Sequence, residues 1–232
     1  RPCRKREMTA IHESDQLLER LLESPRLPFF ARRIQDVLAD EQAARRHFYE
    51  TITEGDKVEY INGDIVYHSP VKLEHNQAGR LLLTLLSTYV TVHGLGFVGY
   101  EKILISLTRN DYEPDLCYFG PQKAAAFQPR QMRFPAPDFV VEILSESTEA
   151  NDRTVKFEDY AAHGVAEYWI IDPAAETVEQ YILAGEVYEL LVKVNNGILQ
   201  SRAVPGFDIS VRAIFDESEN VRALQGILVQ NS

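Results

Sequence analysis

The sequence has little of what marks a secreted, disulfide-rich or membrane-spanning chain. Its 232 residues include two cysteines, Cys3 and Cys117, which are too few for a disulfide framework. No apolar run approaches the roughly 20 residues that a transmembrane helix needs. The basic residues at the start of the sequence lead into no apolar signal core. We therefore expect a cytoplasmic protein with no membrane segment.

An excess of positive charge is also missing. Lysine and arginine number 24 against 35 aspartates and glutamates, and the formal net charge is −11. This balance disfavours a protein coated for non-specific binding to DNA. It does not exclude an enzyme that acts on nucleic acid, because an acidic site that recruits a divalent cation reverses the charge locally.

The hydrophobic pattern divides the chain into a short first segment and one larger domain. Residues 12–50 carry apolar side chains at helical spacing, interrupted at Pro25 and Pro28. From Lys57 onward the pattern changes to alternation, which is typical of strands. We predict a helical extension over residues 1–47 and a domain over residues 48–232.

Within this domain, strand patterns alternate with two helical patterns. A hairpin is expected around Asn62-Gly63 and a long helix over 74–93, ended by Gly94. A second helix follows a cap at Ser147 or Thr148 and ends before Gly164. The other expected strands cover residues 97–107, 115–119, 139–144, 167–171, 177–183, 186–194 and 198–204. This order predicts an α/β or α+β fold with a mixed sheet.

Two acidic residues and one lysine stand out within these elements. Asp115 is expected to open a strand, and Glu142 lies in the apolar run Phe139–Leu144. A carboxylate in such a run is costly to bury unless it is paired or binds a cation. Lys156 follows on the next helix, on the same face as Asp152. Two carboxylates and a lysine are the residue types needed for metal-assisted cleavage of a phosphodiester.

Several segments resemble a known family at this point. They are Glu113-Pro114-Asp115, Pro137–Ser145, Asp152–Lys156, Gly164–Pro173, Val58–Val66, and Ser69-Pro70 with His75. Together they resemble the bacterial putative restriction endonuclease family (domain of unknown function 820), which belongs to the PD-(D/E)XK nuclease superfamily. The resemblance covers about residues 48–190. It implies a central mixed sheet flanked by helices, and an endonuclease that acts on DNA.

The resemblance also implies roles for individual residues. Asp115 and Glu142 would bind Mg²⁺ or Mn²⁺, Glu59 would be a further acid, and Lys156 would be the catalytic lysine. The superfamily pattern places its lysine two residues after the second acid, where this chain has Leu144. His75 would contact a phosphate or act as an acid or base. A homodimer would suit an enzyme that cuts both strands of a duplex.

Each of these residues also has a structural interpretation. Asp115 after Pro114 would cap a turn, and Glu142 would pair with Arg153. Lys156 would be a solvated residue paired with Asp152, while Glu59 and His75 would lie exposed on the surface. For the whole chain, one alternative is a non-catalytic module of nuclease fold that binds nucleic acid or a protein. Another is a glycosidase that uses Asp115 and Glu142 as acid and base.

Overall fold

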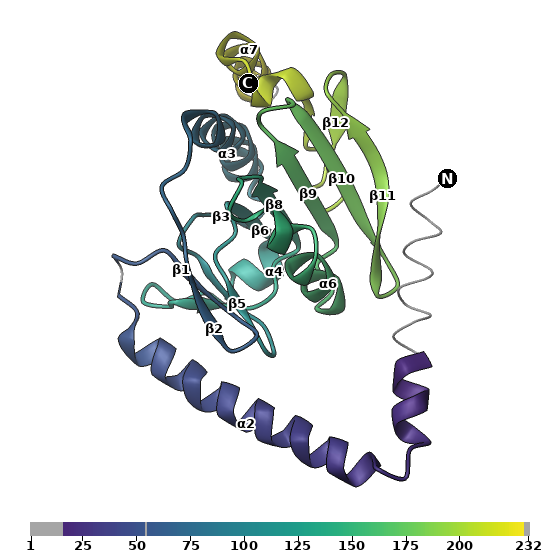
Figure 1. Ribbon diagram of the computed structural model, residues 1–232. Helices are drawn as coiled ribbons and strands as arrows, with labels where there is room; N and C mark the ends of the chain where they lie inside the picture. Colours follow the sequence, from purple (N-terminus) through teal and green to yellow (C-terminus); the bar gives the residue numbers. More distant parts are fainter. Residues whose placement is uncertain (1–15, 54, 230–232) are drawn as a thin grey trace. The chain divides into compact units, whose positions relative to one another are not determined.

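The computed structural model describes residues 16–53 and 55–229 (Figure 1). The chain divides into two compact units. One contains the described residues up to 56 together with residues 62–65, and the other contains residues 57–61 and 66–229. Every residue predicted to carry chemistry lies in the second unit.

The first unit is helical. Residues 16–22 form a helix, and α2 (Leu27–Thr51) follows with 25 residues. The expected interruption falls at residues 23–26, which are not helical. Pro28 does not break the second helix, as the sequence suggested, but lies in its first turn, where a missing N–H costs no hydrogen bond. The expected helical residues 12–15 lie outside the described part of the chain.

A six-stranded mixed sheet forms the centre of the second unit (Figure 1). Its neighbouring strands are antiparallel except for β8 and β9, which are parallel. The strand order is β11 (Val187–Val194), β10 (Thr177–Ala184), β9 (Glu167–Asp172), β8 (Phe139–Ile143), β6 (Leu116–Phe119) and β3 (Phe97–Tyr100). The predicted mixed sheet is therefore confirmed.

A second mixed sheet of five strands was not expected. Its order is β2 (Asp64–Tyr67), β1 (Val58–Ile61), β5 (Asp111–Tyr112), β4 (Leu104–Ser106) and β7 (Arg133–Phe134). The hairpin β1–β2 turns at Asn62 and Gly63, both with positive φ, as predicted. The single strand expected over 97–107 was wrong. The chain bends at Glu101, whose φ is 45°, so that β3 joins one sheet and β4 joins the other.

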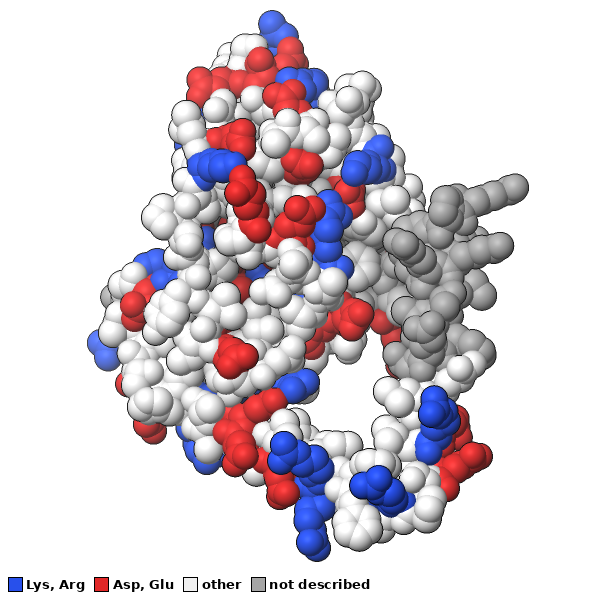
Figure 2. Space-filling model, in the orientation of Figure 1, with Lys and Arg blue, Asp and Glu red and all other residues white. Residues whose placement is uncertain are grey.

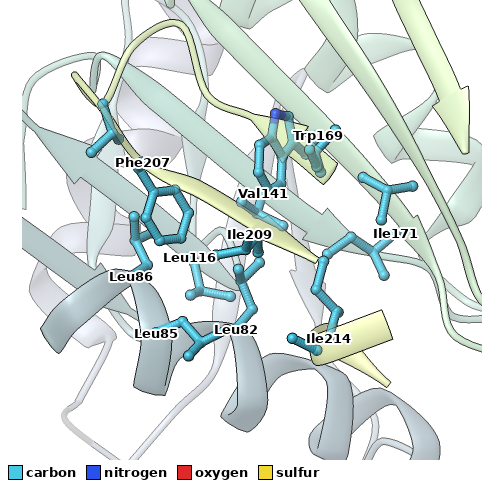
Figure 3. Close-up of a cluster of buried hydrophobic side chains, with 14 of the residues drawn as sticks. Leu82, Leu85, Leu86, Leu116, Val141, Trp169, Ile171, Phe207, Ile209 and Ile214 are labelled. Carbon is cyan, nitrogen blue, oxygen red and sulfur yellow. The ribbon is translucent and has the colours of Figure 1, made fainter. Parts of the chain in front are cut away.

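Two apolar clusters cover the two faces of the six-stranded sheet. The first packs α3 (Leu73–His93) and the C-terminal elements against one face, with Leu82, Leu86 and Trp169 among its members (Figure 3). The second is rich in tyrosine, including Tyr160, Tyr168 and Tyr188. Alternation along β8 sends Val141 into the first cluster and Val140 into the second. Glu142 therefore lies on the face of Val140.

The predicted helix over 74–93 is α3, and Gly94 ends it in the left-handed conformation with φ 63°. The strand expected over 198–204 is shorter and forms β12 (Ile198–Gln200), which pairs with β13 (Asp208–Ser210). A 3₁₀ turn (Val211–Ile214) and α7 (Glu217–Val229), neither of them predicted, then complete the first cluster. A short helix, α4 (Pro121–Ala124), follows β6. None of the described helices is long and apolar enough to cross a membrane.

Candidate active site

Lys156 lies at the centre of a buried group of carboxylates. Its Nζ is 2.9 Å from Glu59 Oε1, 3.1 Å from Glu142 Oε1 and 3.1 Å from Asp152 Oδ1. The Lys156 side chain is 1 % exposed, so water screens these charge interactions only weakly. Burial alone would lower the pKa of Lys156, but the three carboxylates raise it well above its ordinary value. The buried carboxylates therefore favour the charged form of Lys156, and the alternative interpretation of Lys156 as a solvated residue is wrong.

The helix that carries Lys156 differs from the one expected. The sequence suggested one helix from about 148 to 163, but the chain forms α5 (Glu149–Asp152) and α6 (Val155–Ala162). Asp152 ends the first helix and Lys156 lies in the first turn of the second. Arg153, at the junction, donates to both oxygens of Glu179 on β10, at 2.9 and 3.1 Å. This bidentate pair attaches the junction to the sheet.

Asp115 and Glu142 are brought together by strand pairing. Leu116 pairs with Val141 and Cys117 with Val140, so the same antiparallel register places Asp115 beside Glu142. Asp115 lies directly before β6, rather than in it, and accepts a hydrogen bond of 2.8 Å from the Ile143 amide. The turn-capping interpretation of Asp115 does not describe this buried, cross-strand position.

Two cationic or ionisable side chains flank Asp115. His75 Nε2 lies 3.3 Å from Asp115 Oδ2, and Lys57 Nζ lies 3.5 Å from Oδ1. Burial would raise the pKa of Asp115, but His75 and Lys57 lower it below its ordinary value. His75, expected as a residue of the helix start, is the third residue of α3 and is buried. It therefore orients a site carboxylate and is not an exposed surface histidine.

Glu142 and Glu59 have opposite electrostatic environments. Burial raises the pKa of Glu142 well above its ordinary value, because Lys156 offsets only part of that cost and Asp152 adds to it. For Glu59 the effect of burial is outweighed by Lys156 and His68, so its pKa is lowered. Glu59 is 1 % exposed, which rules out the exposed position considered for it. Arg153 does not pair with Glu142, as one alternative suggested, but with Glu149 and Glu179.

A small cavity of about 20 Å³ joins these groups. Its lining includes Asp115, Glu142, Lys156 and His75, together with Lys57 and His68. A space of this size holds about one water molecule. All five predicted site residues therefore meet, because Glu59 contacts Lys156 from the second sheet.

The side chains around the cavity suit a hard divalent cation in ligand type. No group of three or more His, Cys, Asp or Glu side chains in residues 16–53 and 55–229 is arranged to hold a metal ion. Magnesium, however, is commonly held by one or two protein carboxylates and retains several waters. Both hydrogen bonds to the Glu142 carboxylate go to Oε1, from Lys156 and Tyr160, which leaves Oε2 for a further partner. Asp115 and Glu142 thus fit such an ion as a pair.

Four contributors to the site were not identified from the sequence as site residues. Asp152 was considered only as a surface partner of Lys156, yet it is buried beside the ammonium. His68 Nε2 lies 3.3 Å from Glu59 Oε2, and Lys57 contacts Asp115. The Glu113 amide donates to Glu59 Oε1 at 2.9 Å. Lys57 and His68 flank the β1–β2 hairpin, and only the pairing of that hairpin could have drawn attention to them.

Comparisons with known proteins show the family and the fold of the chain. A family model described as "Putative restriction endonuclease" (Uma2) matches residues 45–212. A crystal structure of a putative nuclease belonging to DUF820 from Anabaena variabilis ATCC 29413 has a similar fold, with a TM-score of 0.63 and 18 % sequence identity. The similarity covers 75 % of this chain and 96 % of that one. No curated protein sequence matches the chain.

Proposed function

Because the chain belongs to the Uma2 family of putative restriction endonucleases, we propose that it is an endonuclease that hydrolyses phosphodiester bonds of DNA with a bound Mg²⁺ or Mn²⁺ ion. We place this activity in residues 48–232, with residues 1–47 as an extension. The observation that carries the proposal is the buried contact of the Lys156 ammonium with Glu142, next to Asp115 at the same cavity.

Asp115 and Glu142 would hold the ion. A bound ion of this class lowers the pKa of water and neutralises charge that develops on a phosphate. Lys156 supplies a fixed positive charge beside Glu142, and this charge would offset part of the negative charge that a bound phosphate brings to the cavity. The water oxygen forms a new bond to phosphorus, the bond to the leaving oxygen breaks, and that oxygen takes up a proton.

Glu59 and His75 complete the set as supporting residues. Glu59 holds Lys156 from the five-stranded sheet, at 2.9 Å. His75 fixes the orientation of Asp115 from the first turn of α3. Asp115, Glu142 and Lys156 are held by three different elements. This fixed placement reduces the rearrangement of side chains that the reaction needs.

The test is cleavage of supercoiled plasmid by the wild-type chain with Mg²⁺, with Mn²⁺ and with a chelator. We expect nicking with either metal and none with the chelator. A chain that is folded by circular dichroism but leaves plasmid and linear duplex intact with both metals would contradict the proposal. Sedimentation of the chain with and without duplex tests the homodimer that we propose for cleavage of both strands.

A second candidate function follows from the same contacts. Lys156 already neutralises carboxylates that a metal would otherwise occupy, and no group of three ligands is present among the described residues. These features favour a nuclease-fold module that binds nucleic acid or a protein without cleaving. Calorimetric titration with Mn²⁺ distinguishes the two. The enzyme should bind Mn²⁺ and Glu142→Gln should abolish binding, whereas a binding module would show no metal-dependent heat.

A further inference from the structure

A cleft of about 450 Å³ adjoins the catalytic cavity. The two spaces share Ser69, Val71, His75, Ser145 and Ser147 as lining residues. The cavity itself is too small for more than the reacting group. A polynucleotide whose phosphate reaches Asp115 and Glu142 can continue into the adjoining larger cleft.

An ion pair joins two segments that line this cleft. Lys72, directly before α3, approaches Glu146, in the loop after β8, with Nζ and Oε1 2.6 Å apart. Both side chains are exposed, at 68 % and 87 %. Exposed pairs of this kind contribute little to stability, so the pair can exchange for another partner at small cost.

Lys72 has an unusual position among the charges of the cleft. It is the one lysine or arginine among the described lining residues, and the acids in the lining are Glu74, Glu146, Glu149 and Asp172. On the face drawn in Figure 2, basic and acidic side chains are likewise interspersed. A polyanion that enters the cleft thus meets a single cationic side chain, which already holds an anionic group.

The start of α3 adds to the attraction for an anion at this point. Lys72 is the N-cap residue of this 21-residue helix, and no side chain caps the first turn. The free N–H groups and the helix dipole favour negative charge there. The Glu146 carboxylate lies beside this end of the helix because Lys72 holds it.

We propose that Lys72 contacts a backbone phosphate of the substrate next to the scissile one, and that Glu146 occupies this position as an intramolecular competitor until substrate displaces it. The inference rests on the proposed function and specifies how that site holds a polynucleotide. Phosphate and carboxylate bind to an ammonium in the same way, so binding of substrate exchanges one ion pair for another. Glu146 thereby weakens binding of chains that reach Lys72, because the existing ion pair must first be broken.

The test measures binding separately from cleavage. A fluorescent DNA duplex and the corresponding single strand are titrated with the full chain in Ca²⁺ at several salt concentrations, and anisotropy is recorded. Lys72→Met should weaken binding about tenfold and reduce the slope of log K against log[salt] by about 0.7–0.9, the value of one lost phosphate contact. Glu146→Gln should strengthen binding several-fold, and this gain should disappear when Lys72→Met is combined with it.

A matched control lies on the same helix. Arg80 and Glu217 form an exposed pair with the same 2.6 Å separation, and neither lines the cleft. Arg80→Met and Glu217→Gln should leave binding unchanged. If Lys72→Met behaves like Arg80→Met, or Glu146→Gln changes nothing, the inference is wrong while the proposed function stands. If the wild-type chain binds no DNA at all, both are contradicted.

Discussion

At the scale of single residues, the buried ammonium of Lys156 is the feature on which the site depends. Three carboxylates surround it, and each was taken out of water when the chain folded. Such a group is costly to form, and it becomes much more costly when its one cation is removed. We therefore expect the same residue to be needed for stability as well as for the proposed chemistry.

Lys156→Met should lower the free energy of unfolding by about 3 kcal/mol or more, because it leaves buried carboxylates without a counter-charge. Urea denaturation at neutral pH measures this change. Lys123→Met is the control, since Lys123 pairs with Asp138 at a site that is about one third exposed. Adding Asp152→Asn to Lys156→Met should recover about 1 kcal/mol or more. Additive effects of the two substitutions would show that Asp152 and Lys156 do not interact.

Glu113 gives a prediction for the dependence of stability on pH. Burial raises its pKa to about 7 from an ordinary value of 4.5, and the Val58 amide offsets part of the effect. The folded state thus favours the protonated form of Glu113. The contribution of this group to stability is therefore fully present below pH 4.5 and is lost as the pH rises through 7. As the pH rises from 4.5 to 8, we expect the free energy of unfolding of Glu113→Gln to increase by about 2 kcal/mol relative to that of wild type. Equal unfolding curves of both proteins across that range would contradict it.

The identity of these residues could be predicted from the sequence better than their surroundings. Asp115, Glu142 and Lys156 stand in motifs with ordered spacing, and Glu142 lies in an apolar strand, where a carboxylate requires an explanation. His68 and Lys57 have no such local signal. They reach the cavity because the β1–β2 hairpin pairs with β5, and pairing between distant strands is not encoded in any short segment.

At the scale of elements, the junction between α5 and α6 determines where Lys156 lies. Local propensity predicts one continuous helix here, but the contacts of Arg153 with Glu179 favour a break at the junction. A tertiary contact therefore overrides the local preference. By contrast, Asn62-Gly63 and Gly94 were predictable, because positive φ angles at these positions need such residues.

Glu179→Gln should weaken this junction. Glu179 is buried, but Arg153, Lys193 and Tyr181 lower its pKa to about 2 from 4.5. Its contribution to stability is thus present above pH 4.5 and is lost as the pH falls through 2. We expect Glu179→Gln to lower the free energy of unfolding by about 2 kcal/mol at pH 7. This value is reduced because Arg153 and Lys193 are partly exposed, so that solvent screens their charges. Denaturation at pH 7 and at pH 2 checks the sign, because the stabilities of wild type and variant should become similar at pH 2.

At the scale of the whole molecule, the two sheets divide the work of building the site. The six-stranded sheet contributes Asp115 and Glu142, the five-stranded sheet contributes Glu59, and α6 supplies Lys156. The class of the larger sheet was predicted, but the second sheet was not, because β4, β5 and β7 have only two or three residues each. Strands that short carry no readable alternation.

The net charge of −11 is consistent with a site that uses a few local cations. Lys57, Lys72 and Lys156 all lie at the cavity or the adjoining cleft. Long-range attraction for DNA should therefore be weak, and specificity for a productive position should depend on these contacts. This accounts for an acidic protein with a nuclease fold without invoking a broad basic surface.

The most direct test is the rate of plasmid nicking in Mn²⁺ by wild type and by Asp115→Asn. This substitution keeps the size of the side chain but removes the charge that would hold the ion. We expect nicking by wild type and a loss of at least about a hundredfold in the variant, with both proteins folded by circular dichroism. Equal rates in the two proteins would contradict the assignment of Asp115 and Glu142 as the catalytic centre.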